Sequence, residues 1–402
     1  MRMKHCRVFL AIVAAMSTSH VLALESNGYT TENGLTIIPI LESGLRYNDN
    51  YTRTSDAQSS AIFDVKPGVA IESDRNGNRY RVAYQLDAGF HSNTSDDNYV
   101  DHTFATNNLV RFTTRHALGF NYAFLTQHDA RGSGIASGDA LVANLTTPVE
   151  YKTHVADATY IFGSDNAKGR IEATLDFEDR TYTNYRGSDV LDTTFDDYLQ
   201  IGADGAFYVQ VLPATQLLLQ LDYNNRQYTK NSRSGGSQDY NETYYLTGAV
   251  WEITGKTNGK LRLGIQDKKY DDSSREGSDN FSWDLTVEWK PLEYSTLTID
   301  GGLRNEDADT EEGDLDGSRI SAQWKHYWLA NVYSNLGLNY SRKDYNSVTR
   351  TDDTSSASIK LGYELYERVD LVAGWRGEDN DSNSVGYTYN QNVWSLNANF
   401  AF

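Results

Sequence analysis

Cysteine, basic charge and long apolar runs are scarce in this 402-residue chain, and each scarcity excludes a class of protein. The single cysteine, Cys6, cannot form a disulfide within the chain, so a small disulfide-stapled domain is excluded. The 55 acidic side chains outnumber the 36 basic ones, which argues against nucleic-acid binding because that function needs a basic surface. Beyond the amino terminus, no stretch approaches the roughly 20 apolar residues that a membrane-spanning helix requires.

The first 23 residues have the composition of an export signal. A basic stub precedes an apolar run from Val8 to Met16, and the small-residue exit Val21–Ala23 follows. This order is typical of a secretory signal peptide, whereas the run is too short to span a bilayer as a helix. We predict that residues 1–23 are removed and that residues 24–402 form a single domain. A buried amino-terminal helix is the alternative.

Apolar and polar residues alternate through most of the remaining chain. Residues 281–289 place Phe, Trp, Leu, Val and Trp at every second position, with Ser, Asp, Thr and Glu between them. Residues 171–178 and 80–90 repeat the pattern, and so does the carboxyl-terminal run 394–402, which ends on Phe402. A period of two is the strand period. Because only alternate residues of a transmembrane barrel face lipid, such a chain can cross a membrane without any continuous apolar run.

The connections between these segments fall into two alternating classes. About eight are short, such as residues 74–78, and about nine are long and polar, such as residues 228–240. About 18 strands result, an even number that is typical of bacterial outer-membrane barrels. A soluble β-sandwich or propeller would explain the alternation, but it would not explain the loop asymmetry together with a terminal aromatic strand.

We therefore predict an all-β fold, a transmembrane antiparallel up-and-down β-barrel of about 18 strands in the bacterial outer membrane. Short turns face the periplasm and long loops face the exterior. Aromatic residues near both ends of the last strand, Trp394 and Phe402, are expected in the two aromatic girdles. Pairing of the last strand with the first, near residues 35–47, removes the free edges that lipid cannot tolerate.

Sequence motifs for catalysis are missing. The chain has no HExxH, no GxSxG and no phosphate-binding glycine loop, and its histidines never take metal-ligand spacing. We expect no enzyme activity, no cofactor and no metal site, although a barrel could gather distant residues into a protease or lipase site. The acidic segment Asp307–Asp316 begins like a calcium loop but has Glu312 where glycine is expected. A solvated loop is the favoured interpretation, and loose calcium or magnesium bridging to lipopolysaccharide is the alternative.

The polar face of the strands carries side chains of both charge signs and few apolar side chains. Opposite charges paired across strands would stabilise the wall. A closure of about 18 strands is also wide enough for an aqueous channel, so these side chains are candidates for lining it. The pore-lining candidates are Arg81, Asp87, Asp176, Asp222, Asp284, Glu288, Asp300, Arg304, Glu364 and Arg376. The glycine-rich connection at residues 128–144 is the best candidate for a loop that folds inward and narrows the channel.

Several long connections begin alike, with an apolar strand end that runs into Asp, Asn, Arg and Tyr residues, as in 175–185, 221–232 and 263–274. With the opening 34–50 and the ending 392–402, the chain resembles the porin-like outer-membrane barrels found with exopolysaccharide and capsule synthesis systems. The resemblance implies a component of polymer export that has a polysaccharide ligand. It also implies work with a periplasmic polysaccharide-export protein and the inner-membrane synthesis machinery.

Expected partners also include outer-membrane lipid and lipopolysaccharide, but not nucleic acid. A general or substrate-specific porin for small solutes is one alternative function. A structural or adhesive surface barrel, in which the long loops carry the function, is another.

Overall fold

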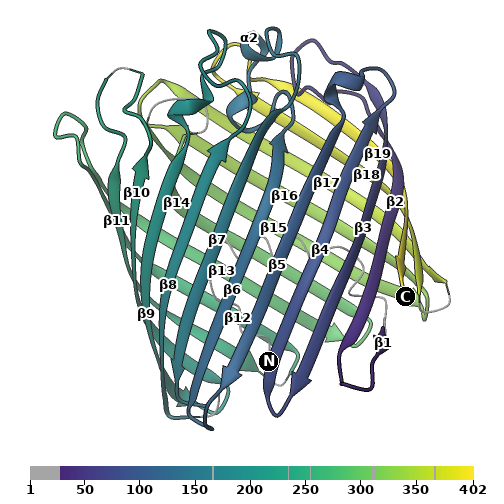
Figure 1. Cartoon of the computed structure of the whole chain (residues 1–402), viewed down its shortest axis with the longest axis vertical. Helices are drawn as coiled ribbons and strands as arrows, with labels where there is room; N and C mark the ends of the chain where they lie inside the picture. Colours follow the sequence, from purple (N-terminus) through teal and green to yellow (C-terminus); the bar gives the residue numbers. More distant parts are fainter. Residues whose placement is uncertain (1–27, 165–166, 234, 254, 309–312, 366–367) are drawn as a thin grey trace.

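The computed structural model is a closed barrel (Figure 1). Among the described residues, 18 long antiparallel strands follow one another in chain order, and the last strand hydrogen-bonds to the first long one. The predicted barrel and its strand number are therefore confirmed. The structure describes residues 28–164, 167–233, 235–253, 255–308, 313–365 and 368–402, so the predicted signal peptide lies outside the described residues.

The strands keep the bounds that the alternation predicts, usually within a few residues. A two-residue strand, β1, pairs with the start of β2. The strands are β1 (Tyr29–Thr30), β2 (Thr36–Asn48), β3 (Ser60–Arg75), β4 (Asn78–His91), β5 (Tyr99–Arg111), β6 (His116–Asp129), β7 (Val149–Phe162), β8 (Gly169–Tyr182), β9 (Tyr198–Leu212), β10 (Thr215–Tyr228), β11 (Tyr240–Ile253), β12 (Thr257–Tyr270), β13 (Ser278–Leu292), β14 (Ser295–Asp307), β15 (Asp314–Leu329), β16 (Val332–Tyr345), β17 (Arg350–Leu365), β18 (Val369–Ser382) and β19 (Tyr389–Ala401).

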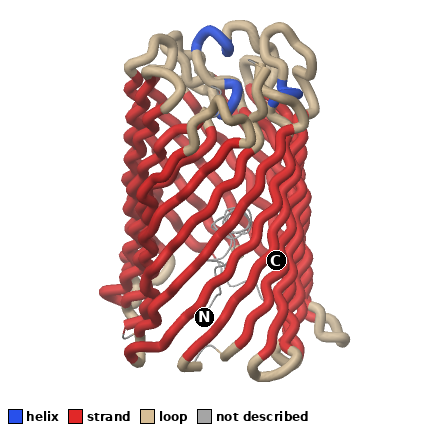
Figure 2. Tube along the Cα trace, turned by 90° about the vertical axis from the view of Figure 1, so that its left-hand side faces the viewer, coloured by secondary structure: helices blue, strands red, loops and turns tan. Residues whose placement is uncertain are grey.

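Long loops gather at one end of the barrel, together with short helices, and tight turns gather at the other (Figure 2). One expected long loop is different: the connection between β16 and β17 is only residues 346–349. The prediction of a long loop at residues 344–353 was wrong because the ladder continues to the pair Tyr345 and Arg350, and the side chain of Arg350 bonds Asp352 on the same strand. The helices are η2 (Ser95–Asp97), η3 (Gly134–Ala136), α2 (Asp139–Val142) and η4 (Thr193–Phe195).

The outer face of the strands is apolar and exposed. In β19, Leu396 is 64% exposed and Trp394 is 45% exposed, and they pair with Leu45 and Tyr47 of β2. The rings of Tyr47 and Trp394 lie 6.0 Å apart across this closure. Such a surface belongs in lipid, since a water-exposed patch of this extent would associate or aggregate. No helix among the described residues is long and apolar enough to cross a membrane.

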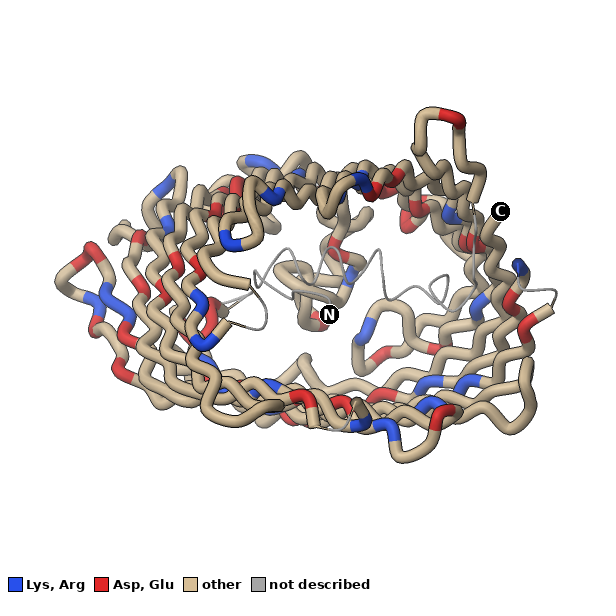
Figure 3. Tube along the Cα trace, turned by 90° about the horizontal axis from the view of Figure 1, so that it is seen from below, with Lys and Arg blue, Asp and Glu red and all other residues tan. Residues whose placement is uncertain are grey.

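The barrel is elongated in cross-section, and acidic and basic residues are distributed along its wall (Figure 3). Side chains reach past their neighbouring strand in the sector β10–β15. Arg226 of β10 bonds Asp307 of β14, and Gln266 of β12 donates to the carbonyl of Asn305 at 2.8 Å. The wall in this sector therefore bends sharply enough that side chains from strands two or four positions apart come into contact.

Candidate functional site

The ten side chains predicted to line a pore all lie on the strand face opposite the exposed apolar residues. In β10, Asp222 is 2% exposed and stands between the lipid-facing Leu221 and Tyr223. In β8, Asp176 stands between Leu175 and an exposed phenylalanine in the same way. The alternation and the strand register place the other eight on this face too, so the structure gathers residues more than 290 positions apart onto one inner wall.

At mid-wall, one carboxylate holds two guanidinium groups. Arg262 donates its Nε to Asp284 at 2.9 Å, and Arg304 donates an Nη to the same carboxylate at 3.2 Å. Arg262 also donates to the side-chain oxygen of Gln220 at 3.1 Å. These charge-assisted bonds tie β10, β12, β13 and β14 together and fix the side chains against the wall.

Most of the other candidates are also paired, which supports a wall-stabilising role for them. Each pair joins an inward-facing side chain to a neighbour on its own or an adjacent strand, apart from one contact between β15 and β17. The pairs are Asp87 with Lys66 (2.5 Å), Arg81 with Glu72 (3.2 Å), Asp222 with Gln220 (2.7 Å), Glu288 with Lys290 (2.9 Å), Asp300 with Thr286 (2.8 Å), Glu364 with Tyr327 (2.6 Å) and Arg376 with Glu378 (2.5 Å). Unpaired charge on the inner wall is therefore scarcer than the composition suggests.

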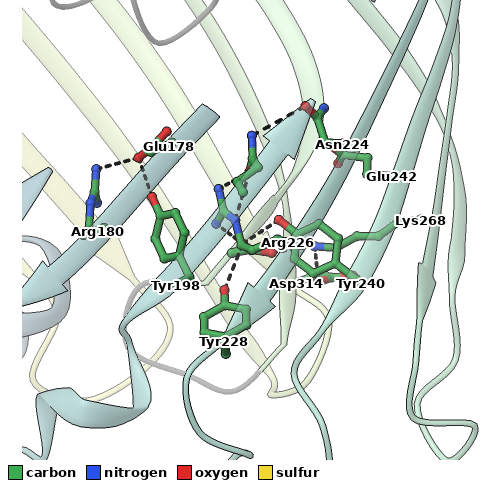
Figure 4. A network of polar contacts seen from close by, with 12 residues as sticks. Glu178, Arg180, Tyr198, Asn224, Arg226, Tyr228, Tyr240, Glu242, Lys268 and Asp314 are labelled. Atoms are coloured by element: carbon green, nitrogen blue, oxygen red, sulfur yellow. Dashed lines mark hydrogen bonds and ion pairs between the residues drawn. The ribbon is translucent and has the colours of Figure 1, made fainter. Parts of the chain in front are cut away.

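A buried network near the long-loop end includes Arg226, Tyr240 and Lys268 (Figure 4), and Asp307 is their shared acceptor. Lys268 donates to its carboxylate at 2.6 Å and Tyr240 donates at 2.8 Å, while Arg226 forms a further ion pair. Lys268 is 1% exposed and also bonds Asp314 at 2.9 Å. Asp307 ends β14 and Asp314 begins β15, so the solvated-loop interpretation is wrong for both carboxylates: nearby cations draw them into the wall.

The proposed resemblance of this acidic segment to a calcium loop finds no support in the described part of the chain. Two of its alternating carboxylates, Asp309 and Glu311, lie outside the described residues. Within the described residues, no group of three or more His, Cys, Asp or Glu side chains could hold a metal ion.

Several strand ends are alike in sequence, but sequence reasoning missed the cation-x-tyrosine repeat within them. Four strands end on a cation, any residue and a tyrosine: Lys343–Tyr345 ends β16, and the three beside this network are Arg180–Tyr182, Arg226–Tyr228 and Lys268–Tyr270. Since residues i and i+2 share a face of a strand, each cation and its tyrosine point to the same side of the wall. The three cations beside the network lie over tyrosine rings of adjacent strands: Arg180 over Tyr151 (4.9 Å), Arg226 over Tyr198 (4.1 Å) and Lys268 over Tyr240 (4.0 Å). We call this row the cation–tyrosine ladder.

The loop at residues 130–148 packs against four other loops at the mouth of the barrel, which is its long-loop end. Arg131 forms an ion pair with Asp97 at 2.5 Å, and the backbone N–H of Asp139 donates to the carbonyl of Gly386 at 2.9 Å. Gly132 has a φ of 86°, and a Cβ added there would meet the carbonyl oxygen of Thr52. The prediction that glycines let this loop fold tightly is therefore confirmed in its geometry.

An apolar cluster fastens the same loop to the next one. Ile135 and Leu145 are buried, and they pack with Val149 at the start of β7 and with Tyr182 at the end of β8. The hydroxyl of Tyr185 bonds Thr147, which joins loop 183–197 to the cluster. Loop 130–148 thus joins loop 383–388 to loop 183–197.

Two carboxylates of loop 183–197 differ in acidity. Bonds from Thr194 hold the pKa of Asp192 at about 2, whereas burial raises the pKa of Asp196 to about 6. An acid whose folded-state pKa exceeds its unfolded value destabilises the fold once it ionises. The penalty is absent below about pH 4 and complete above about pH 6, where it reaches roughly 2 kcal/mol.

We expect Asp196→Asn to slow amide hydrogen exchange in residues 183–197 by roughly tenfold at pH 7.5, because the buried side chain at position 196 is then no longer ionised. At pH 4.5 the variant and the parent protein should exchange at more nearly equal rates. Hydrogen-exchange mass spectrometry of both proteins at the same two pH values checks this. Equal protection of the variant and the parent protein at both pH values would show that ionisation of Asp196 does not affect the stability of the loop.

A cavity of about 600 Å³ lies inside the mouth, between β2, β3, β17–β19 and the roots of loops 49–59 and 130–148. Its lining is polar, with amide, hydroxyl, aromatic and charged side chains. Its lining includes Arg376, one of the ten candidates, and Arg131, from the loop that is predicted to narrow the channel.

A sealed antiparallel cylinder with an apolar exterior, a polar inner wall and loops at one end defines an outer-membrane barrel of the porin class. The family model described as "Putative beta-barrel porin 2" matches residues 31–402, and the chain belongs to this family. A comparison with curated proteins gives no sequence match.

Solved structures of outer-membrane proteins are similar to this chain at very low sequence identity, and OccK2 shares its fold. OccK2 of Pseudomonas aeruginosa is 8% identical, with a TM-score of 0.51 over 93% of this chain and 99% of that one. OccAB3 of Acinetobacter baumannii is 10% identical, with a TM-score of 0.48 over 92% and 99% of the two chains. The siderophore receptor PirA of Acinetobacter baumannii is 9% identical, with a TM-score of 0.47 over 90% and 80%.

Proposed function

We propose that this porin-family barrel supports the export of an exopolysaccharide or capsule polymer across the outer membrane, as a passive conduit. One observation carries the proposal: the inner wall offers paired charges, amides and hydroxyls, with apolar side chains mainly on the outside. A hydrated sugar polymer needs such polar partners, whereas a lipid cargo would need an apolar track. The resemblance of the strand ends and termini to barrels of polymer-export systems also supports polymer export.

Conduction then requires no catalytic group in the barrel, and polymer synthesis on the inner side supplies the driving force. A periplasmic polysaccharide-export protein would meet the short-turn end, and lipopolysaccharide would surround the long-loop end. The ten inward-facing candidates, most of them paired, would form the walls of the conduit rather than binding groups of their own.

A small-solute porin is the second candidate, and one observation favours it. Loop 130–148 is fastened to neighbouring loops at the mouth by an ion pair, backbone bonds and an apolar cluster. A mouth with a loop anchored in this way suits a small solute better than a continuous polymer chain.

Deleting the gene separates these functions. We expect loss of secreted matrix polymer with unchanged uptake of small sugars, measured on the same cells, and complementation by the full chain should restore the polymer. Altered uptake with normal polymer would instead support the small-solute porin. If neither changes and the purified protein is silent in planar bilayers, a surface scaffold is the remaining function.

A further inference from the structure

The cavity inside the mouth carries a charge opposite to that of the whole protein. Three carboxylates line it, Glu42, Asp64 and Asp97, although the chain has a formal net charge of −19. The basic residues that line it are Arg46, Arg53, Lys66, Arg131, Lys360 and Arg376. Six cations against three carboxylates in one polar cavity favour an anionic occupant.

The positive excess is concentrated on one side of the cavity. Arg46 pairs with Asp64 and Arg131 pairs with Asp97, so these cations are compensated. Glu378, which lies just outside the lining, accepts from Arg376 at 2.5 Å, and it is also the partner of Arg53 at 3.3 Å.

Two cations therefore share one carboxylate on this side. In the part of the chain that the structure describes, Lys360 has no carboxylate within ion-pair distance. The ammonium of Lys360 and the guanidinium of Arg376 are thus the charges that an incoming anion would meet.

Strand register brings these two cations together beside the small residues Gly374 and Ser395, which we call the floor of the cavity. Lys360 of β17 lies opposite Gly374 of β18, and Arg376 follows two residues later on the same face. Gly374 in turn lies opposite Ser395 of β19, which lies opposite Arg46 of β2. Lys360 and Arg376 therefore stand on one side of the floor, and Arg46 stands on the other.

The floor itself has room because Gly374 has no side chain. A Cβ at that position would lie 3.0 Å from the hydroxyl oxygen of Ser395 and 3.3 Å from the Cγ of Lys360. Asn397 and Asn399 add amide groups to the lining nearby. One cavity therefore holds cations that can bind a carboxylate, and amides and a hydroxyl that can bind sugar hydroxyls. Its volume lies in the range of small-molecule sites.

We infer that this cavity binds an acidic saccharide, with a uronate carboxylate against Lys360 and Arg376 and sugar hydroxyls against the floor of Ser395 and Asn397. The inference rests on the proposed function and narrows it: the polymer that passes this barrel carries carboxylates. Loop 130–148, which closes the cavity through Arg131, would then cover the bound sugar unit.

Isothermal titration calorimetry of the detergent-purified full chain tests the inference at low ionic strength, where charge pairing is weakly screened. The probes are trigalacturonate, maltotriose and acetate. We expect trigalacturonate to bind at least tenfold more tightly than maltotriose, and acetate to bind too weakly to detect. Lys360→Gln should weaken trigalacturonate binding at least tenfold, and Lys360→Arg should retain most of the affinity.

Lys290→Gln is the matched control, because Lys290 pairs with Glu288 near the short-turn end and is remote from the cavity. It should leave the affinity for trigalacturonate unchanged. The inference would be overturned if maltotriose or acetate bound as tightly as trigalacturonate, or if no probe bound. It would also be overturned if Lys360→Gln bound trigalacturonate as tightly as the parent protein. Failure of the proposed function would be seen separately, as normal matrix polymer after gene deletion.

Discussion

Replacing Asp307 with alanine is expected to loosen the long-loop end of the barrel more than any other single change in the wall. The carboxylate of Asp307 compensates Lys268 and Arg226 and accepts hydrogen bonds from Tyr228 at 3.2 Å and Tyr240 at 2.8 Å. Alanine leaves the guanidinium of Arg226 without its carboxylate partner, and it leaves Lys268 with Asp314 alone. Removing one partner of a buried ion pair typically costs about 3–5 kcal/mol.

Guanidinium unfolding of the barrel refolded into lipid vesicles measures this cost. Asp307→Ala should lower the free energy of unfolding by about 3 kcal/mol or more, and Asp307→Asn, which retains an acceptor oxygen, should lose less. Asp267→Ala is the control, because Asp267 pairs with Lys269, whose side chain is 74% exposed, and it should unfold like the parent protein. Equal losses for Asp307→Ala and Asp267→Ala would refute the central place of Asp307 in the network.

The sequence was sufficient to predict the barrel because the information for a lipid-facing strand is local. Alternation of Asp284 and Glu288 with tryptophan and leucine determines which face meets lipid, and no distant contact is needed to recognise it. Closure then follows, since an open edge in lipid would leave backbone groups unsatisfied. All ten pore-lining candidates could be placed on the inner face from this parity alone.

The partners of these residues could not be predicted because they depend on the shape of the cross-section. Arg226 and Asp307 are 81 positions apart and lie four strands apart, and they meet only because the wall bends in the sector β10–β15. The acidic segment that begins at Asp307 was interpreted as a loop since its local charge density is that of a solvated segment. The cation–tyrosine ladder was visible as a repeat, but its stacking required the register between strands.

Loop 130–148 is the second place where a large effect is expected. Replacing residues 133–144 with two glycines removes η3, α2 and the apolar cluster that Ile135 supplies, while the flanking strands keep their ends. Because the loop joins loop 383–388 to loop 183–197 at the mouth, its removal should raise single-channel conductance in planar bilayers several-fold. The prediction that this loop narrows the conducting path is tested directly by that measurement.

A smaller change should act in the same direction if the ion pair at the root of the loop holds it in place. The Asp97 carboxylate raises the pKa of Arg131 through its hydrogen bonds, and Arg131 also donates to the hydroxyl of Tyr51 at 3.0 Å. Arg131→Gln should therefore increase the rate of current fluctuations, because the loop opens more often, and raise the mean conductance less than the deletion. Deleting residues 273–276, which belong to the loop between β12 and β13 and not to the contacts described for loop 130–148, is the control and should leave the conductance unchanged. If the two deletions conduct alike, the constriction lies elsewhere in the lumen, and the charge pairs at mid-wall around Asp284 become the place to look for it.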